Sequence, residues 1–144
     1  ESSDRFMERL LDMERGILEI DGSPTRFLMA TLVELYLGNR LVYRISTSEF
    51  LKTKSAIRED FLDGRSEAVI DHIRAIAVRL MERGIFDPAL DPRHVALSIM
   101  TMVSGPVSLL TVLSSEWVSE RELASAAWID HLTRLVDCAF RKRD

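Results

Sequence analysis

Cysteine is almost absent from this chain of 144 residues, which has a single one, Cys138. A lone thiol excludes an internal disulfide and the Cys-x-x-Cys pairs of structural zinc sites. Basic residues are not in excess, because 19 Lys and Arg stand against 23 Asp and Glu, a net charge of −4. This balance argues against a chain that wraps nucleic acid with its own surface. One free thiol is typical of a reducing compartment, so we expect a cytoplasmic protein.

Charged residues are missing between Val95 and Ser115, although 29% of the chain is charged. The segment is about long enough to cross a bilayer. However, Ser and Thr recur through it, Gly105-Pro106 interrupts it, and no basic cluster flanks it, so we expect no membrane span. A helix that is apolar all round must be covered all round. The expected cover is a second protein chain, and Pro106 should bend the helix.

Catalytic and metal-binding patterns are also missing. The three histidines, His72, His94 and His131, are far apart, and no Glu has a His three residues on, as di-iron bundles require. The chain has no Gly-rich phosphate loop and no Gly-x-Ser-x-Gly turn. We therefore expect no catalytic residue, no metal and no cofactor. An enzyme with a site in a bundle core stays an alternative, and it predicts a bound metal or cofactor.

Helices are the elements that the sequence predicts. Apolar residues recur at three-four spacing, and no alternating strand pattern occurs. Start signals are Ser23-Pro24, Asp91-Pro92 and the capping box Ser119 to Glu122, and Gly84 is a stop signal. The expectation is one all-α domain over 1–144, with five to six helices. The main ones run over about 2–20, 24–46, 53–83, 92–115 and 120–140.

The segment from Gly84 to Val103 has the most distinctive sequence pattern in the chain. A long helix ends in Arg83-Gly84-Ile85-Phe86, a loop leads to Asp91-Pro92, a Gly-containing apolar helix follows, and a capped amphipathic helix closes the chain. This order resembles the C-terminal ligand-binding and dimerisation domain of the tetracycline-repressor (TetR) family of bacterial transcription regulators. The resemblance implies a homodimer that binds an operator and releases it when a small molecule binds.

In that family a helix-turn-helix domain precedes such a chain. Since the sequence opens without an initiator Met, we expect that domain to be absent from 1–144 and DNA to be bound only through it. The last two helices would form a four-helix bundle with their symmetry mates. The residues expected at this dimer interface are Val103, Val107, Leu110, Ala124, Ala127, Trp128, His131 and Leu135.

A mostly apolar effector pocket is expected between the second, the long and the charge-free helices. Such sites are lined mostly by apolar side chains, with a few polar groups among them. The residues expected to line it are Tyr36, Asn39, Tyr43, Phe61, His72, Met100 and Met102. Each of them also fits an ordinary core position, since tyrosine tips reach solvent and methionines fill gaps. The alternative function is a helical dimerisation or protein-interaction module without a small-molecule ligand.

Overall fold

The structure is a computed structural model of the chain, and it describes residues 2–38, 64–110, 113–114 and 116–143. Every regular element in these ranges is a helix, apart from one antiparallel bridge between Phe86 and Arg141. The predicted all-α class is therefore confirmed. The helices are α1 (Ser2–Gly16), α2 (Pro24–Gly38), α5 (Gly64–Glu82), α6 (Pro92–Leu109), α7 (Glu120–Leu123) and α8 (Ala126–Phe140).

The turn between α1 and α2 forms as its residues predict. Gly22 has a φ of +97°, a left-handed conformation that side chains disfavour. The Arg26 N–H donates to Ser23 Oγ at 3.2 Å, so Ser23 is the N-cap of α2 and Pro24 takes its first position. The first helix ends at Gly16 rather than near Ile20, because the chain there tightens into a turn in which the Glu19 N–H donates to the Gly16 carbonyl.

The end of α5 also agrees with the prediction. The Ile85 N–H donates to the Leu80 carbonyl at 2.9 Å, and the Gly84 N–H donates to the Met81 carbonyl at 3.0 Å. These two bonds define a Schellman motif, which requires a left-handed residue, and Gly84 has a φ of +75°. The predicted start of this helix near Thr53 lies outside the described residues.

The C-terminal tail holds the loop that follows α5. The Asp87 N–H donates to the Phe140 carbonyl at 2.8 Å, and the Lys142 N–H donates to the Ile85 carbonyl at 3.1 Å. The Phe86 ring is fully buried, with its centroid 6.0 Å from that of Phe140. These contacts place the end of α8 and the loop leading into α6 at the same end of the molecule.

The charge-free segment is helical over only part of its length. Asp91 is the N-cap of α6, as predicted, because its Oδ1 accepts the Arg93 N–H at 2.8 Å. The helix contains Pro106 and ends at Leu109, before the predicted end near Ser115. Proline supplies no N–H, so the last turn has one helical bond fewer. The chain then tightens, and the Leu110 N–H donates to the Val107 carbonyl at 3.2 Å.

The last predicted helix is in fact two helices. Ser119 starts α7, because its Oγ accepts the Glu122 N–H at 3.1 Å. Ser125 starts α8, because its Oγ accepts the Trp128 N–H at 3.2 Å and donates to the Glu122 carbonyl at 2.6 Å. Serine competes with the helix for backbone groups and favours such caps. The prediction of one helix over 120–140 was therefore wrong at Ser125.

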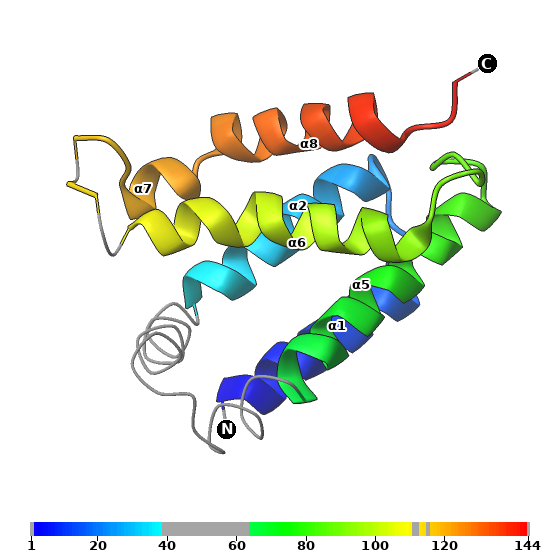
Figure 1. Ribbon diagram of the computed structural model, residues 1–144, viewed down its shortest axis with the longest axis horizontal. Helices are drawn as coiled ribbons and strands as arrows, with labels where there is room; N and C mark the ends of the chain where they lie inside the picture. The colour runs from blue at the N-terminus through cyan, green and yellow to red at the C-terminus, as the bar shows by residue number, and fades with distance from the viewer. Residues whose placement is uncertain (1, 39–63, 111–112, 115, 144) are drawn as a thin grey trace.

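Within the described ranges, the helices pack in a simple order, which Figure 1 shows. The helices α6 and α8 lie side by side and run in opposite directions, with α7 beside the end of α6. Behind them, α2 packs against both, and α5 packs against α6 on one side and α1 on the other. No helix in the described part of the chain is long and apolar enough to span a membrane.

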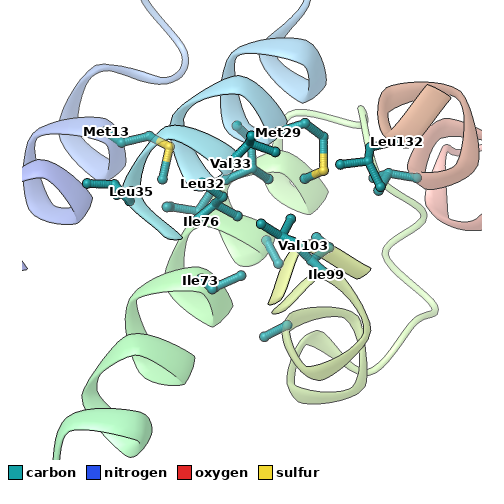
Figure 2. Close-up of a cluster of buried hydrophobic side chains, with 14 of the residues drawn as sticks. Met13, Met29, Leu32, Val33, Leu35, Ile73, Ile76, Ile99, Val103 and Leu132 are labelled. Carbon is teal, nitrogen blue, oxygen red and sulfur yellow. The ribbon is translucent and has the colours of Figure 1, made fainter. Parts of the chain in front are cut away.

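The core lies where α2, α5 and α6 meet (Figure 2). Leu32, Ile73, Ile76 and Ile99 are fully buried there. Figure 2 also shows Met13 of α1 beside Leu35 at one end of the cluster, and Leu132 of α8 reaching toward Met29 at the other. Apolar burial of this kind is the main force that holds helices together. It leaves α6 and α8 as an outer pair.

Candidate functional site

The last helix, α8, has three different faces. Leu132 and Val136 point inward and are buried. A second face carries Asp130 and Arg134, and Arg26 of α2 donates from Nε to the Asp130 Oδ1 at 2.8 Å. The third face is exposed or half-buried yet contains no Asp, Glu, Lys or Arg. It consists of Ala127, Trp128, His131, Leu135 and Cys138. The Trp128 and His131 rings stack at 5.3 Å on this face.

The outer face of α6 is likewise free of charge. Its residues lie on the side of the helix opposite the buried residues, and all but Leu109 are small. They are Ser98, Thr101, Gly105, Ser108 and Leu109. The Thr101 Oγ1 donates to the Leu97 carbonyl at 2.7 Å, and the Ser108 Oγ donates to the Ser104 carbonyl at 3.0 Å. Because these hydroxyls bond within their own helix, covering this face with another chain costs little hydrogen bonding.

Gly105 occupies the middle of this outer face. Among the described residues, a Cβ added there would meet no atom within 4 Å beyond its own neighbours in the sequence. One of these neighbours is Pro106, whose ring clashes with a Cβ on a helical residue before it, so a glycine is favoured here within the chain itself. In a helix interior, glycine costs about 1 kcal/mol relative to alanine. A residue without a side chain does, however, let another helix approach the backbone closely.

Large apolar side chains are exposed on only a few elements, as far as the described residues extend. Leu109, Leu113, Trp117 and Leu135 are 44%, 42%, 78% and 43% exposed. All four lie on α6, on α8 or on the segment that follows α6. We call these residues, with the third face of α8 and the outer face of α6, the uncharged surface. Contiguous exposed apolar patches in soluble proteins mark interaction sites.

The residues predicted for a dimer interface divide into two groups. Ala124, Ala127, His131 and Leu135 are exposed, and Leu110 and Trp128 are half-buried. Val103 and Val107, by contrast, are only 1% and 3% exposed and belong to the protomer's own core. Their placement at an interface is therefore corrected.

The sequence pattern missed Gly105 and Leu109, which occupy the outer face of α6. A helix without charged residues gives no sign of which side faces inward. The small residues at three-four spacing were the one available signal.

The residues predicted for an effector pocket are only partly brought together. Tyr36 is buried at 6% exposure within the core cluster, and Met100 and Met102 are half-buried and pack against that cluster. Asn39, Tyr43 and Phe61 lie outside the described residues. Buried side chains of α2, α5 and α6 meet at the centre between these helices (Figure 2).

His72 turns out to connect two helices. Its Nδ1 lies 2.9 Å from Glu14 Oε2 of α1, and the two side chains are 25% and 18% exposed. This is the most buried ion pair among the described residues; the others are about half exposed or more. The contact ties α1 to α5, so one ring nitrogen of His72 is already engaged within the chain.

Groups for metal binding are not assembled in the described ranges, where no three His, Cys, Asp or Glu side chains are placed to hold an ion. The N-cap carboxylate of Asp91 is the one described group whose pKa clearly departs from its ordinary value. Its pKa is lowered, first because the Arg93 N–H donates to the carboxylate, and further because His94 and Arg93 are positively charged neighbours. A cap of this kind stabilises the start of α6 and is no sign of catalysis.

Comparison with known proteins identifies one family. Residues 25–138 match the family model described as "Tetracyclin repressor-like, C-terminal domain". The match runs from the first turn of α2 into the last turn of α8, and so includes both helices of the uncharged surface. No curated protein was found to match the chain.

Proposed function

Because this chain belongs to the tetracycline repressor-like C-terminal domain family, we propose that it is the effector-binding and dimerisation domain of a transcription regulator. In this proposal, an N-terminal helix-turn-helix domain binds the operator, and dimerisation of the present chain brings two such DNA-binding domains together. Domains of this family are regulatory, which agrees with the expectation that the chain is no enzyme. The cytoplasmic location expected from the sequence belongs to the same proposal.

Dimerisation through the uncharged surface rests on one observation: Leu109, Leu113, Trp117 and Leu135 are exposed together on and around α6 and α8. Covering a leucine that is 43% exposed contributes on the order of 1 kcal/mol. In an isologous dimer each such contact occurs twice. The outer face of α6 and the third face of α8 would then pack against their copies as a four-helix bundle.

The effector is a small, mostly apolar molecule in this proposal. Tyr36, Met100 and Met102 supply an aromatic ring and adaptable thioethers beside the core. In this proposal the ligand lies beside these residues, where Met100 and Met102 pack against the buried cluster. If the ligand binds better to the conformation with one spacing of the two DNA-binding domains, it increases the population of that conformation. A coupling of about 1–3 kcal/mol is enough for a useful switch.

A second candidate is a dimerisation module without a small-molecule ligand. The many fully buried side chains between α2, α5 and α6 favour it, since a close-packed interior leaves little space for a ligand. Native mass spectrometry of the purified protein separates the two candidates. A bound small apolar molecule supports the effector domain, and dimers that never bind one support the module.

The dimer itself is tested by sedimentation equilibrium of the chain and of Leu135→Glu. We expect the chain to be a dimer at micromolar concentration and the variant to be a monomer, because the new carboxylate would be buried against a second copy. Arg134→Glu is the matched control, because Arg134 is the preceding residue and lies on the charged face of α8. This variant should leave the dimer intact, although it changes the net charge more than Leu135→Glu does. A monomeric parent chain would refute the proposed dimer.

A further inference from the structure

Glu14 of α1 and His72 of α5 form a polar contact in an apolar seam between the two helices. An ionised carboxylate accepts hydrogen bonds and donates none, so the His72 Nδ1, which lies 2.9 Å from Glu14 Oε2, carries the proton of this contact. The residues one turn before and after the two partners are all apolar: Leu10, Leu11, Ile17 and Leu18 around Glu14, and Ala68, Val69, Ala75 and Ile76 around His72. A polar group in such surroundings costs free energy unless it is paired.

Two neighbouring apolar stripes run along α1. Leu10, Met13 and Ile17 form the first stripe, and all three are buried, with exposures of 2% or less. Leu11 and Leu18 belong to the second stripe, which is half-buried and stands one position further along the chain. Leucine and isoleucine have nearly the same volume, and swaps of equal volume are the ones that cores tolerate best. The second stripe therefore offers the core nearly the same side chains as the first.

Glu14 interrupts the second stripe at its middle. A rotation of α1 about its axis by about 100°, the angle of one residue, would bring the second stripe to the core. Glu14 would then take the place of Met13, which is 2% exposed, and would lose its contact with His72. Arg15, which is exposed, would take the place of Glu14, so that a hydrogen-bond donor would replace the acceptor beside His72. The rotated helix would bury a carboxylate without its partner, which is strongly unfavourable.

We propose that the contact between Glu14 and His72 selects the rotation of α1 on α5, and that it contributes little to overall stability. The apolar side chains hold the two helices together in either rotation, and the polar pair decides between the rotations. Replacing a buried ion pair with apolar residues is often neutral for stability, whereas one polar residue in an apolar helix interface can fix its register. This role is independent of the proposed dimer and of the proposed effector.

The second contact that ties α1 to a neighbouring helix through charged side chains is of a different kind. Arg9 and Glu34 of α2 lie 3.4 Å apart, and their side chains are 53% and 71% exposed. Exposed ion pairs contribute little, because solvent screens them. This pair is therefore not expected to fix the rotation of α1.

The double variant Glu14→Leu with His72→Leu tests the proposal by NMR spectroscopy of the isotope-labelled chain. It makes the second stripe continuous, so we expect the amides of α1 to give two sets of signals, or broadened signals, from the two rotations. The parent chain should give one sharp set. The melting temperature of the double variant should stay within about 3 °C of the parent's, because apolar contacts replace the polar pair.

Two single variants serve as controls. Glu14→Gln keeps an acceptor for His72 and a polar group in the second stripe, so it should give one sharp set of α1 signals. His72→Leu leaves the Glu14 carboxylate without its partner, so it should lower the melting temperature by about 5 °C, more than the double variant does.

The outcomes separate the choice of rotation from stability. One sharp set of α1 signals from the double variant would overturn the proposal, because apolar packing alone would then fix the rotation. A double variant that melts below His72→Leu would also overturn it, since the pair would then be needed for stability itself. Several sets of signals from Glu14→Gln would show that α1 is loose with a polar residue in place, and would contradict the proposal too.

Discussion

Gly84 and Gly105 show how the same residue type serves two purposes. Gly84 has a φ of +75°, and it closes the Schellman motif that ends α5. Gly105 lies within α6 without a positive φ, and it directly precedes Pro106, whose ring would clash with a Cβ on the residue before it. The first glycine is required by the backbone of a single chain. The second eases the helical conformation before Pro106, and we propose that it also lets another helix approach closely.

Replacing Gly84 with alanine should destabilise the fold by about 1–2 kcal/mol, the cost of a left-handed conformation for a residue with a Cβ. No steric term is expected, because a Cβ at this position has no neighbour within 4 Å. Urea denaturation measures the change. Gly16→Ala is the control, since Gly16 has no neighbour within 4 Å either and no positive φ, and it should not destabilise the chain. Equal effects at both positions would contradict the backbone explanation.

At the level of elements, short polar side chains decide where helices start. Ser23, Asp91, Ser119 and Ser125 each accept a hydrogen bond from a backbone N–H in the first turn of their helix. A cap of this type contributes about 1 kcal/mol. Ser125 divides the C-terminal segment, so that α7 belongs to the α6 end of the uncharged surface and α8 forms one of its two long helices.

The Asp91 cap should make α6 sensitive to acid. Its pKa is lowered in the folded chain, so its stabilising effect is present above the ordinary value of 3.8 and is lost as the pH falls through the lowered pKa. Asp91→Asn keeps a capping oxygen without the charge. The melting temperature of the parent should exceed that of the variant at about pH 6, and the difference should shrink below about pH 3.8. A difference independent of pH would show that the charge of Asp91 is not involved.

At the level of the molecule, the helices α6 and α8 contribute both to the core and to the uncharged surface. The inner sides of both helices complete a core shared with α2 and α5, and the outer sides form the uncharged surface. Leu132 and Leu135, three residues apart on α8, illustrate the division, with exposures of 1% and 43%. Folding and association should therefore depend on different residues of the same helix.

Truncating each of these leucines to alanine tests the division. Leu132→Ala should lower the free energy of unfolding by about 2–5 kcal/mol, because it leaves a cavity in a packed core. Leu135→Ala removes little packing from the protomer, so its main effect should be a weaker dimer. Urea denaturation at low protein concentration measures the first effect, and sedimentation equilibrium measures the second. A Leu135→Ala protomer as unstable as Leu132→Ala would show that the two sides are not separate.

Local signals were sufficient for the helical class, for the caps at Ser23, Asp91 and Ser119, and for the stop at Gly84, because caps and stops involve residues within one turn of each other. The break at Ser125 was missed although its signal was equally local, since an apolar pattern continues through it. That the charge-free segment is covered by a second chain stays a prediction, although Leu109 and Leu113 at its end are exposed.

The direction in which each residue of that segment points was decided only by the tertiary structure. In a segment with no charged residue, the sequence pattern is nearly the same on every side, so Val103 and Val107 were assigned outward although they are buried within the protomer. The joining of α1 to α5 through Glu14 and His72, 58 positions apart, likewise has no local signal. Contacts between residues distant in the chain depend on how whole helices pack, and short-range spacing carries no information about that packing.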